Sequence, residues 1–111
     1  MAKPTLQEVF GINANQDIEF VRVAKADLAA IGLTVEATNN AEELLVAILK
    51  KAHQTLTETS FGTNIDQSIV IAPGFKTYTT RGEANDNYEQ RTYEIRMHKL
   101  DTDTDIDPDN Y

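Results

Sequence analysis

The sequence contains no cysteine, and only two of its 111 residues are histidine. Disulfides, thiolate metal sites and a cysteine nucleophile are therefore excluded. Basic residues are also scarce, with ten Lys and Arg against eighteen Asp and Glu. Binding to nucleic acid is disfavoured, because affinity for phosphate depends on a basic surface. The sequence has no apolar stretch of membrane-spanning length and no recognisable signal peptide, so we expect no membrane partner.

Residue patterns of catalysis are missing as well. Ser60 and Ser68 are the only serines, and neither stands in a G-x-S-x-G context. The five glycines are isolated and form no phosphate-binding loop. His53 lies at the border of an apolar helix face and His98 on a polar strand face, without carboxylates at ligand spacing. We predict a protein that is not an enzyme, with no catalytic residue, no cofactor and no metal site.

The acidic charge is concentrated at one end of the chain. Residues 1–100 carry ten basic and thirteen acidic side chains, whereas residues 101–111 contain five aspartates and no basic residue. A chain of this length forms one domain with a modest core. We therefore predict a single globular domain over residues 1–100, followed by an acidic C-terminal arm over residues 101–111.

One long helix is the clearest structural signal. Asn40, with Glu43 three residues later, resembles a capping box, which starts a helix. From Ala41 to about Leu56, apolar residues recur at helical spacing and form one face. A shorter helix is predicted between Thr5 and Gly11. We expect the long helix to pack its apolar face on a sheet face; the side chains expected to meet are Leu45, Ile48, Leu49 and Ala52 with Tyr93, Ile95 and Met97.

The remaining segments suggest strands. Ile18–Ala24 and Leu33–Ala37 are strand candidates before the helix. After it, a meander of three strands is expected, over 68–72, 75–81 and 88–100, with a type II turn at Pro73–Gly74 and a loop over 82–87. The predicted class is α+β, in the order ββ-α-βββ, with the helix on one face of a small, mainly antiparallel sheet.

The C-terminal arm carries an aspartate at every odd position from 101 to 109. Such a run normally stays disordered, and a solvated tail that aids solubility is one reading. The opening resembles a calcium loop, but Ile106 stands where an EF-hand requires glycine. Ile106 and Tyr111 are apolar handles that solubility alone does not require. We predict that the arm lies extended along a neighbouring subunit through Asp101, Asp103, Asp105, Ile106, Asp107, Asp109 and Tyr111.

Four stretches of the chain carry a resemblance to known sequences. They are FGINANQ (10–16), KADL (25–28), LTETSFGTNID (56–66) and IDPDNY (106–111). They resemble small, mostly uncharacterised proteins of cyanobacteria and their tailed phages. The resemblance implies a virion or phage-derived particle component, made in the host cytoplasm: a capsid decoration, tail or baseplate part.

These observations favour a non-enzymatic structural subunit of a larger assembly. Its expected partners are other copies of itself, other structural proteins of the assembly, or both. The alternative from another class is a small cytosolic binding or regulatory domain whose helix-and-sheet groove takes a ligand or a protein. Solution mass separates the two, because a regulatory domain could remain a stable monomer.

Overall fold

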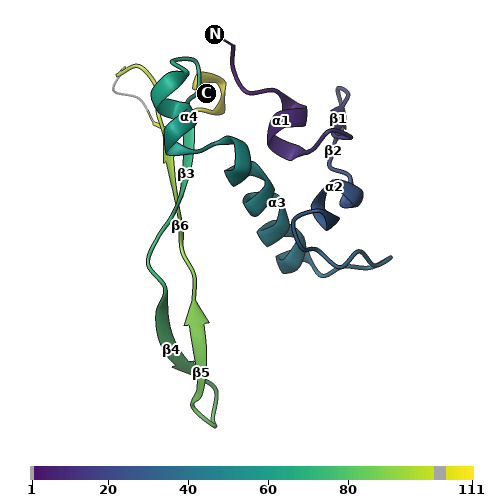
Figure 1. Ribbon diagram of the computed structural model, residues 1–111, viewed down its shortest axis with the longest axis vertical. Coiled ribbons are helices and arrows are strands. Elements are labelled where there is room, and N and C mark those ends of the chain that lie inside the picture. The colour runs from purple at the N-terminus through teal and green to yellow at the C-terminus, as the bar shows by residue number, and fades with distance from the viewer. Residues whose placement is uncertain (1, 102–104) are drawn as a thin grey trace.

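The structure is a computed structural model that describes residues 2–101 and 105–111. It consists of a helical body and a long two-stranded ribbon that projects from it (Figure 1). The radius of gyration is 16.6 Å and the extents are 51 × 35 × 26 Å. A compact chain of this length would have a radius of gyration of roughly 13 Å. The molecule is therefore strongly elongated.

The described residues form helices and small antiparallel sheets, which confirms the predicted α+β class. The helices are α1 (Leu6–Phe10), α2 (Lys25–Ala29), α3 (Ala41–Thr55) and α4 (Glu58–Thr63), followed by a 3-10 turn, η1 (Pro108–Asn110). The strands are β1 (Asn15–Gln16), β2 (Val21–Arg22), β3 (Ile69–Pro73), β4 (Thr77–Arg81), β5 (Asp86–Gln90) and β6 (Tyr93–Met97). They pair as β1–β2, β3–β6 and β4–β5.

The predicted long helix is confirmed as α3, and its start has the predicted capping box. The Asn40 side chain accepts a hydrogen bond from the backbone N of Glu43 at 2.8 Å. In return, Glu43 Oε1 accepts from the backbone N of Asn40 at 3.1 Å. The buried Asn39 side chain donates to Glu43 Oε1 at 2.7 Å and to the carbonyl oxygen of Thr34 at 2.9 Å. The network ties the preceding loop to the first turn of α3.

Replacing Asn40 with alanine should destabilise the fold by about 1 kcal/mol, because the backbone N of Glu43 loses its acceptor at the helix end. Urea unfolding followed by circular dichroism measures this change. The matched control is Asn40→Ser, which keeps a capping oxygen and should stay close to wild type. Equal losses of unfolding free energy in both variants would show that the capping oxygen of residue 40 does not stabilise the helix.

The ribbon is one long hairpin made of two paired segments. Near the body, β3 pairs with β6, so that Ile71 lies opposite Ile95. Farther out, β4 pairs with β5, and the chain reverses through residues 82–85, within the predicted loop. The expected three-stranded meander is therefore wrong, because the strand after Pro73 continues outward and does not fold back beside β3.

A β-bulge separates the two paired segments. Residues 74–76 on one strand face only residues 91–92 on the other. The backbone N of Gly74 donates to the carbonyl oxygen of Thr92 at 2.7 Å. A Cβ at position 74 would lie 3.1 Å from Thr92 Cβ, so the close approach favours glycine. The Pro73–Gly74 signal thus marks a bulge and not the predicted type II turn.

The strands predicted before α3 also differ. The segment 33–37 forms no strand, and of Ile18–Ala24 only β2 is extended and paired. Its partner is β1, which is two residues long and lies across a tight turn. Sequence alternation alone did not reveal that the segment 33–37 remains unpaired and that β2 pairs over only two residues.

The core is small. Ala52 and Leu56 of α3 and its C-terminus form a buried cluster with Ile71, and Tyr93 packs against it. The predicted contact of α3 with the sheet is therefore correct at Ala52. It fails for Leu45, Ile95 and Met97, which are 56%, 44% and 45% exposed.

Candidate assembly surfaces

The most conspicuous surface is the outer part of the ribbon. Every residue from 73 to 92, called the outer ribbon below, is exposed. The body does not cover either face of this segment (Figure 1). Isolated two-stranded ribbons are at best marginally stable in water. An outer ribbon of this length is therefore poorly supported by the chain itself.

The outer ribbon presents aromatic rings beside cations. Lys76 Nζ lies 5.7 Å from the centre of the Tyr78 ring, and Arg81 lies 5.4 Å from that of Tyr88. The hydrogen bond from Arg91 lowers the pKa of Glu89 below its usual range. Tyrosine and arginine are enriched at protein interfaces. The surface therefore has the side chains of a protein-recognition element.

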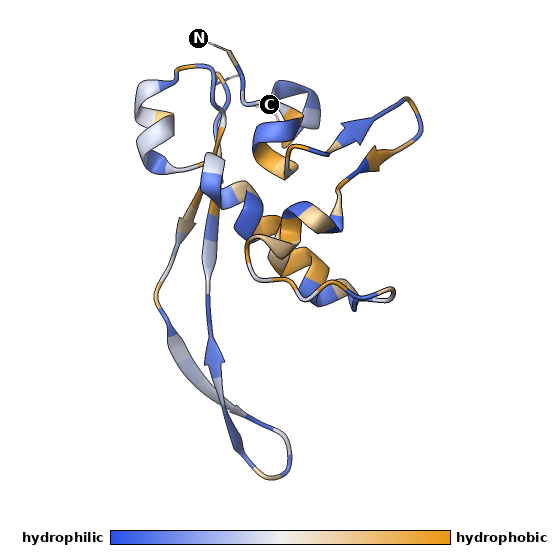
Figure 2. Cartoon of the chain, turned by 45° about the vertical axis from the view of Figure 1, so that its right-hand side comes forward, coloured by the Kyte–Doolittle hydropathy of each residue, from blue (hydrophilic) through white to orange (hydrophobic). Residues whose placement is uncertain are grey.

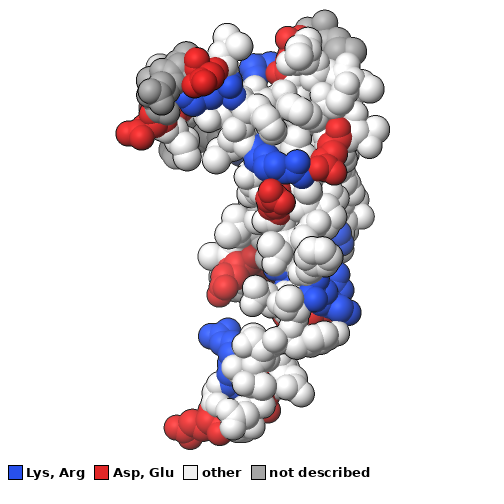
Figure 3. Space-filling model, turned by 90° about the vertical axis from the view of Figure 1, so that its left-hand side faces the viewer, with Lys and Arg blue, Asp and Glu red and all other residues white. Residues whose placement is uncertain are grey.

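Charge on the outer ribbon is balanced. It contains three basic residues, Lys76, Arg81 and Arg91, and three acidic ones, Glu83, Asp86 and Glu89. Basic and acidic side chains also alternate over the face of the molecule shown in Figure 3. Ribbon arms that bind DNA depend on an excess of basic charge. This ribbon is thus suited to a protein surface and poorly suited to phosphate.

An apolar groove lies between α3 and the root of the ribbon. Two adjoining cavities of about 390 and 460 Å³ share Leu49 and Ile95 in their walls. We call this surface the α3–ribbon groove and define it by Val46, Leu49, Tyr93 and Ile95. Lys3 lines one of the two cavities and Arg91 lines the other. The groove is open to solvent, since Val46 and Ile95 are 59% and 44% exposed.

The C-terminal tail reaches the same groove. Tyr111 is half-buried and lines one of the two cavities together with Ile69 of its own chain. Asp107 accepts a hydrogen bond from the backbone N of Asp109 at 3.0 Å and starts η1. The end of the tail is therefore a turn against its own body and not the extended arm that the sequence predicted.

The remaining arm residues are placed as follows. Asp101, Asp105, Ile106, Asp107 and Asp109 are exposed, with Ile106 at 70%, whereas Asp103 lies outside the described residues. The docking of these residues on a neighbouring subunit stays a prediction. Of the two apolar handles, Ile106 remains exposed and Tyr111 does not.

A second exposed apolar surface was not singled out from the sequence. It lies at the turn between β1 and β2, on the side of α3 opposite the ribbon, and forms a hydrophobic tip in Figure 2. We call it the β1–β2 knob; its residues are Ile18, Phe20 and Val21, with exposures of 102%, 59% and 60%. The available signal was Asp17, a turn-forming residue directly before an apolar segment whose alternation changes phase.

Asp17 organises the knob. Its Oδ1 accepts hydrogen bonds from the backbone N of Glu19 at 2.8 Å and of Phe20 at 2.9 Å. Its Oδ2 pairs with Arg22 at 2.8 Å, and the Arg22 guanidinium lies 5.5 Å from the centre of the Phe20 ring. The apolar side chains are thus presented by a tightly hydrogen-bonded turn.

The knob turn should loosen in acid. Hydrogen bonds from the Glu19 and Phe20 backbone, and then from Arg22, lower the pKa of Asp17 below its ordinary 3.8. A carboxyl group with a lowered folded pKa stabilises the fold above its unfolded pKa, and this contribution is lost as pH falls through the folded value. We expect the amide signals of Glu19 and Phe20 in NMR spectra to move together below about pH 4. Asp17→Asn should abolish the transition; its persistence would contradict the assignment.

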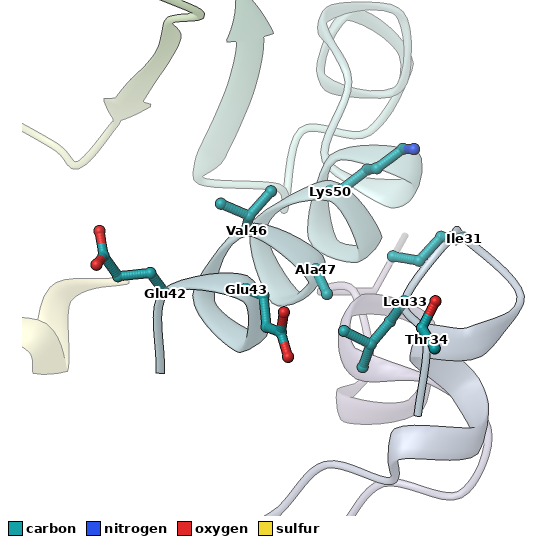
Figure 4. A pocket seen from close by; sticks show the side chains of 9 residues that line it. Ile31, Leu33, Thr34, Glu42, Glu43, Val46, Ala47 and Lys50 are labelled. Atoms are coloured by element: carbon teal, nitrogen blue, oxygen red, sulfur yellow. The ribbon is translucent and has the colours of Figure 1, made fainter. Parts of the chain in front are cut away.

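A third hollow, of about 500 Å³, lies between α3 and the segment 31–34 (Figure 4). Ile31, Leu33 and Ala47 form its apolar wall, while Glu42 and Lys50 lie at its edge. Glu43, which also lines it, already bonds Asn39 and Asn40. The hollow offers no convergent set of polar groups for a cofactor.

The two histidines make contacts that organise the fold. The His53 ring lies 5.4 Å from that of Tyr93, and the His98 ring 4.4 Å from that of Phe61. His98 Nδ1 also lies 3.0 Å from the carbonyl oxygen of Ser68. Within the described residues, no group of three or more His, Asp or Glu is placed to hold a metal ion. Nor is any helix in that part of the chain long and apolar enough to cross a membrane.

Comparison of the chain with protein-family models, with curated proteins and with solved structures finds no match. The surfaces suited to contact with a partner are the outer ribbon, the α3–ribbon groove and the β1–β2 knob.

Proposed function

We propose that this chain is a non-enzymatic structural subunit of a larger assembly and holds neighbouring protein subunits through its ribbon. The observation that carries the proposal is the exposure of all residues from 73 to 92 on a ribbon that projects from the body. A two-stranded ribbon without a third strand or a packed face gains little stability from its own chain. Contact with a neighbour supplies the missing support.

The amount of exposed surface supports the same conclusion. A compact monomer of 12.4 kDa exposes about 6,100 Å². The accessible surface of this chain is 8509 Å², an excess of about 2,400 Å². A standard interface buries about 800 Å² on each partner, so the excess equals about three such patches. Fifteen large apolar or aromatic side chains are exposed among the described residues, which is the kind of surface that association covers.

The sequence resemblance favours one kind of assembly. Tailed phages and phage-derived particles are built from many copies of small subunits, and we propose that this chain is one of them, as a capsid decoration, tail or baseplate part. Its location would then be the virion or a phage-like particle. The outer ribbon has equal numbers of basic and acidic residues, and the chain has a net charge of −8. Both features are consistent with contacts to protein and not to the packaged nucleic acid.

Sedimentation equilibrium tests the proposal. Wild type should associate reversibly above its 12.4 kDa chain mass. A variant in which residues 75–91 are replaced by Asn-Gly keeps β3 and β6 and should associate at least about tenfold more weakly. A full-length variant with Phe75, Tyr78 and Tyr88 changed to serine serves if the shortened chain does not fold. Wild type that remains monomeric at every concentration overturns the proposal.

The α3–ribbon groove is the observation that favours the alternative, a small binding domain. Cavities of a few hundred cubic ångströms with apolar walls are typical of small-ligand sites. A binding domain would be a stable monomer that takes up an apolar fluorescent probe stoichiometrically. An assembly subunit should lose probe binding as it associates.

A further inference from the structure

The α3–ribbon groove and the β1–β2 knob are both apolar, and they lie on opposite sides of α3 (Figures 1 and 2). Ile18 at the tip of the knob is 102% exposed, so its own chain does not cover it. Tyr111 lines part of the groove, and the exposed Val46 and Ile95 leave it open to solvent. Each surface therefore lacks a cover that the other could provide.

We infer that the β1–β2 knob of one copy enters the α3–ribbon groove of a second copy, so that the subunits associate head to tail. This inference rests on the proposed assembly function and names its partner. Ile18 and Phe20 would lie against Leu49 and Ile95 of the neighbour. The neighbour's outer ribbon, which starts at the same groove, would then lie along the body that carries the knob.

The chemistry of the surfaces selects the knob as the occupant. The groove walls are apolar, and the knob presents two aliphatic side chains and one aromatic ring. The tip of the outer ribbon instead carries Gly82, Glu83 and Asn85, whose burial in an apolar groove would remove polar groups from water. The charges also agree, because Glu19 beside the knob is acidic and Lys3, which lines the groove, is basic.

The arrangement of the two surfaces sets the symmetry. A two-fold dimer requires that each subunit present its knob and its groove to the same partner. Surfaces on opposite sides of α3 instead face two different neighbours, and such a heterologous contact generates a ring or an open filament. An internal subunit then buries about 800 Å² at each of two patches, which fits within the excess surface of about 2,400 Å².

The test uses full-length chains in sedimentation equilibrium. The knob variant is Ile18→Asp with Phe20→Asp, and the groove variant is Ile95→Glu. Ile65→Asp is the control, because Ile65 is 91% exposed but belongs to neither surface. Wild type and control should form species larger than dimers. Knob and groove variants should associate at least about a hundredfold more weakly, since each loses anchors at the centre of the contact.

Mixing the two variants gives the decisive result. The knob variant retains an intact groove and the groove variant an intact knob, so an equimolar mixture should form 1:1 dimers that cannot grow. A mixture that remains monomeric, or a knob variant that associates as wild type does, overturns the inference. Val46→Glu, on the exposed face of α3, replaces Ile95→Glu if the latter unfolds the ribbon.

The experiment separates this inference from the proposed function. If shortening the ribbon abolishes association while the knob variant associates normally, the chain is an assembly subunit whose groove has another occupant. If wild type is monomeric, both conclusions fail. Circular dichroism and thermal melts of each variant show whether a lost contact reflects a lost fold.

Discussion

Replacing Gly11 with alanine is expected to destabilise the fold by about 3–5 kcal/mol, a large part of the roughly 5–15 kcal/mol typical of a domain. Gly11 is buried and has φ 116° and ψ 153°, a region that only glycine adopts readily. An added Cβ would lie 2.4 Å from Asp27 Oδ2. That carboxylate accepts two hydrogen bonds from Asn13, at 2.9 Å each, which joins the loop after α1 to α2. Both bonds would be lost if Asp27 moved aside.

The control for this substitution is Gly62→Ala. Gly62 lies within α4, and a Cβ there would have no atom within 4 Å. Alanine is favoured over glycine in a helix by about 0.5–1 kcal/mol, so this variant should be more stable than wild type. Urea unfolding of both variants at low protein concentration measures the difference in their free energies of unfolding. A loss below about 1 kcal/mol for Gly11→Ala would mean that the loop accommodates a side chain.

The second large effect is expected for Leu28→Ala, which should cost about 2–5 kcal/mol. Leu28 in α2 is 2% exposed and is one of the two largest fully buried side chains among the described residues. The core around it is small, so little else can compensate for the cavity. The transition should move to clearly lower urea concentration in an unfolding experiment followed by circular dichroism.

Leu45→Ala is the matched comparison, because it removes the same atoms from a leucine that is 56% exposed on α3. Leucine and alanine both favour helix, so the free energy of unfolding should change by no more than about 0.5 kcal/mol. The sequence periodicity predicts Leu45 in the core, whereas the structure leaves it exposed. If Leu45→Ala cost as much as Leu28→Ala, that face of α3 would be covered in solution, against the structure.

Elements with local signals could be predicted from the sequence. The start of α3 follows from Asn40 and Glu43 alone, since a capping box involves only residues three apart. The same holds for α1, where Thr5 and Glu8 form a capping box and Gly11 ends the helix. Apolar periodicity then fixed the length of α3 correctly, because no proline or glycine interrupts it.

Strand pairing could not be predicted in the same way. Alternation at Tyr93 and Ile95 is identical whether the facing surface is filled or open, so it did not show that the ribbon leaves α3. Pro73–Gly74 is compatible with both a reversal and a bulge, and the long-range pairing of Ile71 with Ile95 decides between them. The charge of the tail predicted an exposed arm, whereas Tyr111 at its end lines the groove.

The candidate surfaces, too, could be predicted from the sequence only in part. The sequence pattern pointed to the aspartates of the tail and not to Ile18 and Phe20. Each of these two residues looks like an ordinary strand residue in isolation. Their exposure accompanies the Asp17 turn, which presents them outward, and no strand or helix of the described residues covers them.

The bulge at Gly74 allows the length of the ribbon to change without a change in the groove. Pairing restarts beyond the bulge, so the register of β4 with β5 is set independently of the register that shapes the groove. Adding two residues to each strand before the 82–85 loop would lengthen the ribbon by about 7 Å and keep every side chain on its face. Relatives or engineered versions of this chain could therefore span wider or narrower spacings between neighbours while the α3–ribbon groove stays the same.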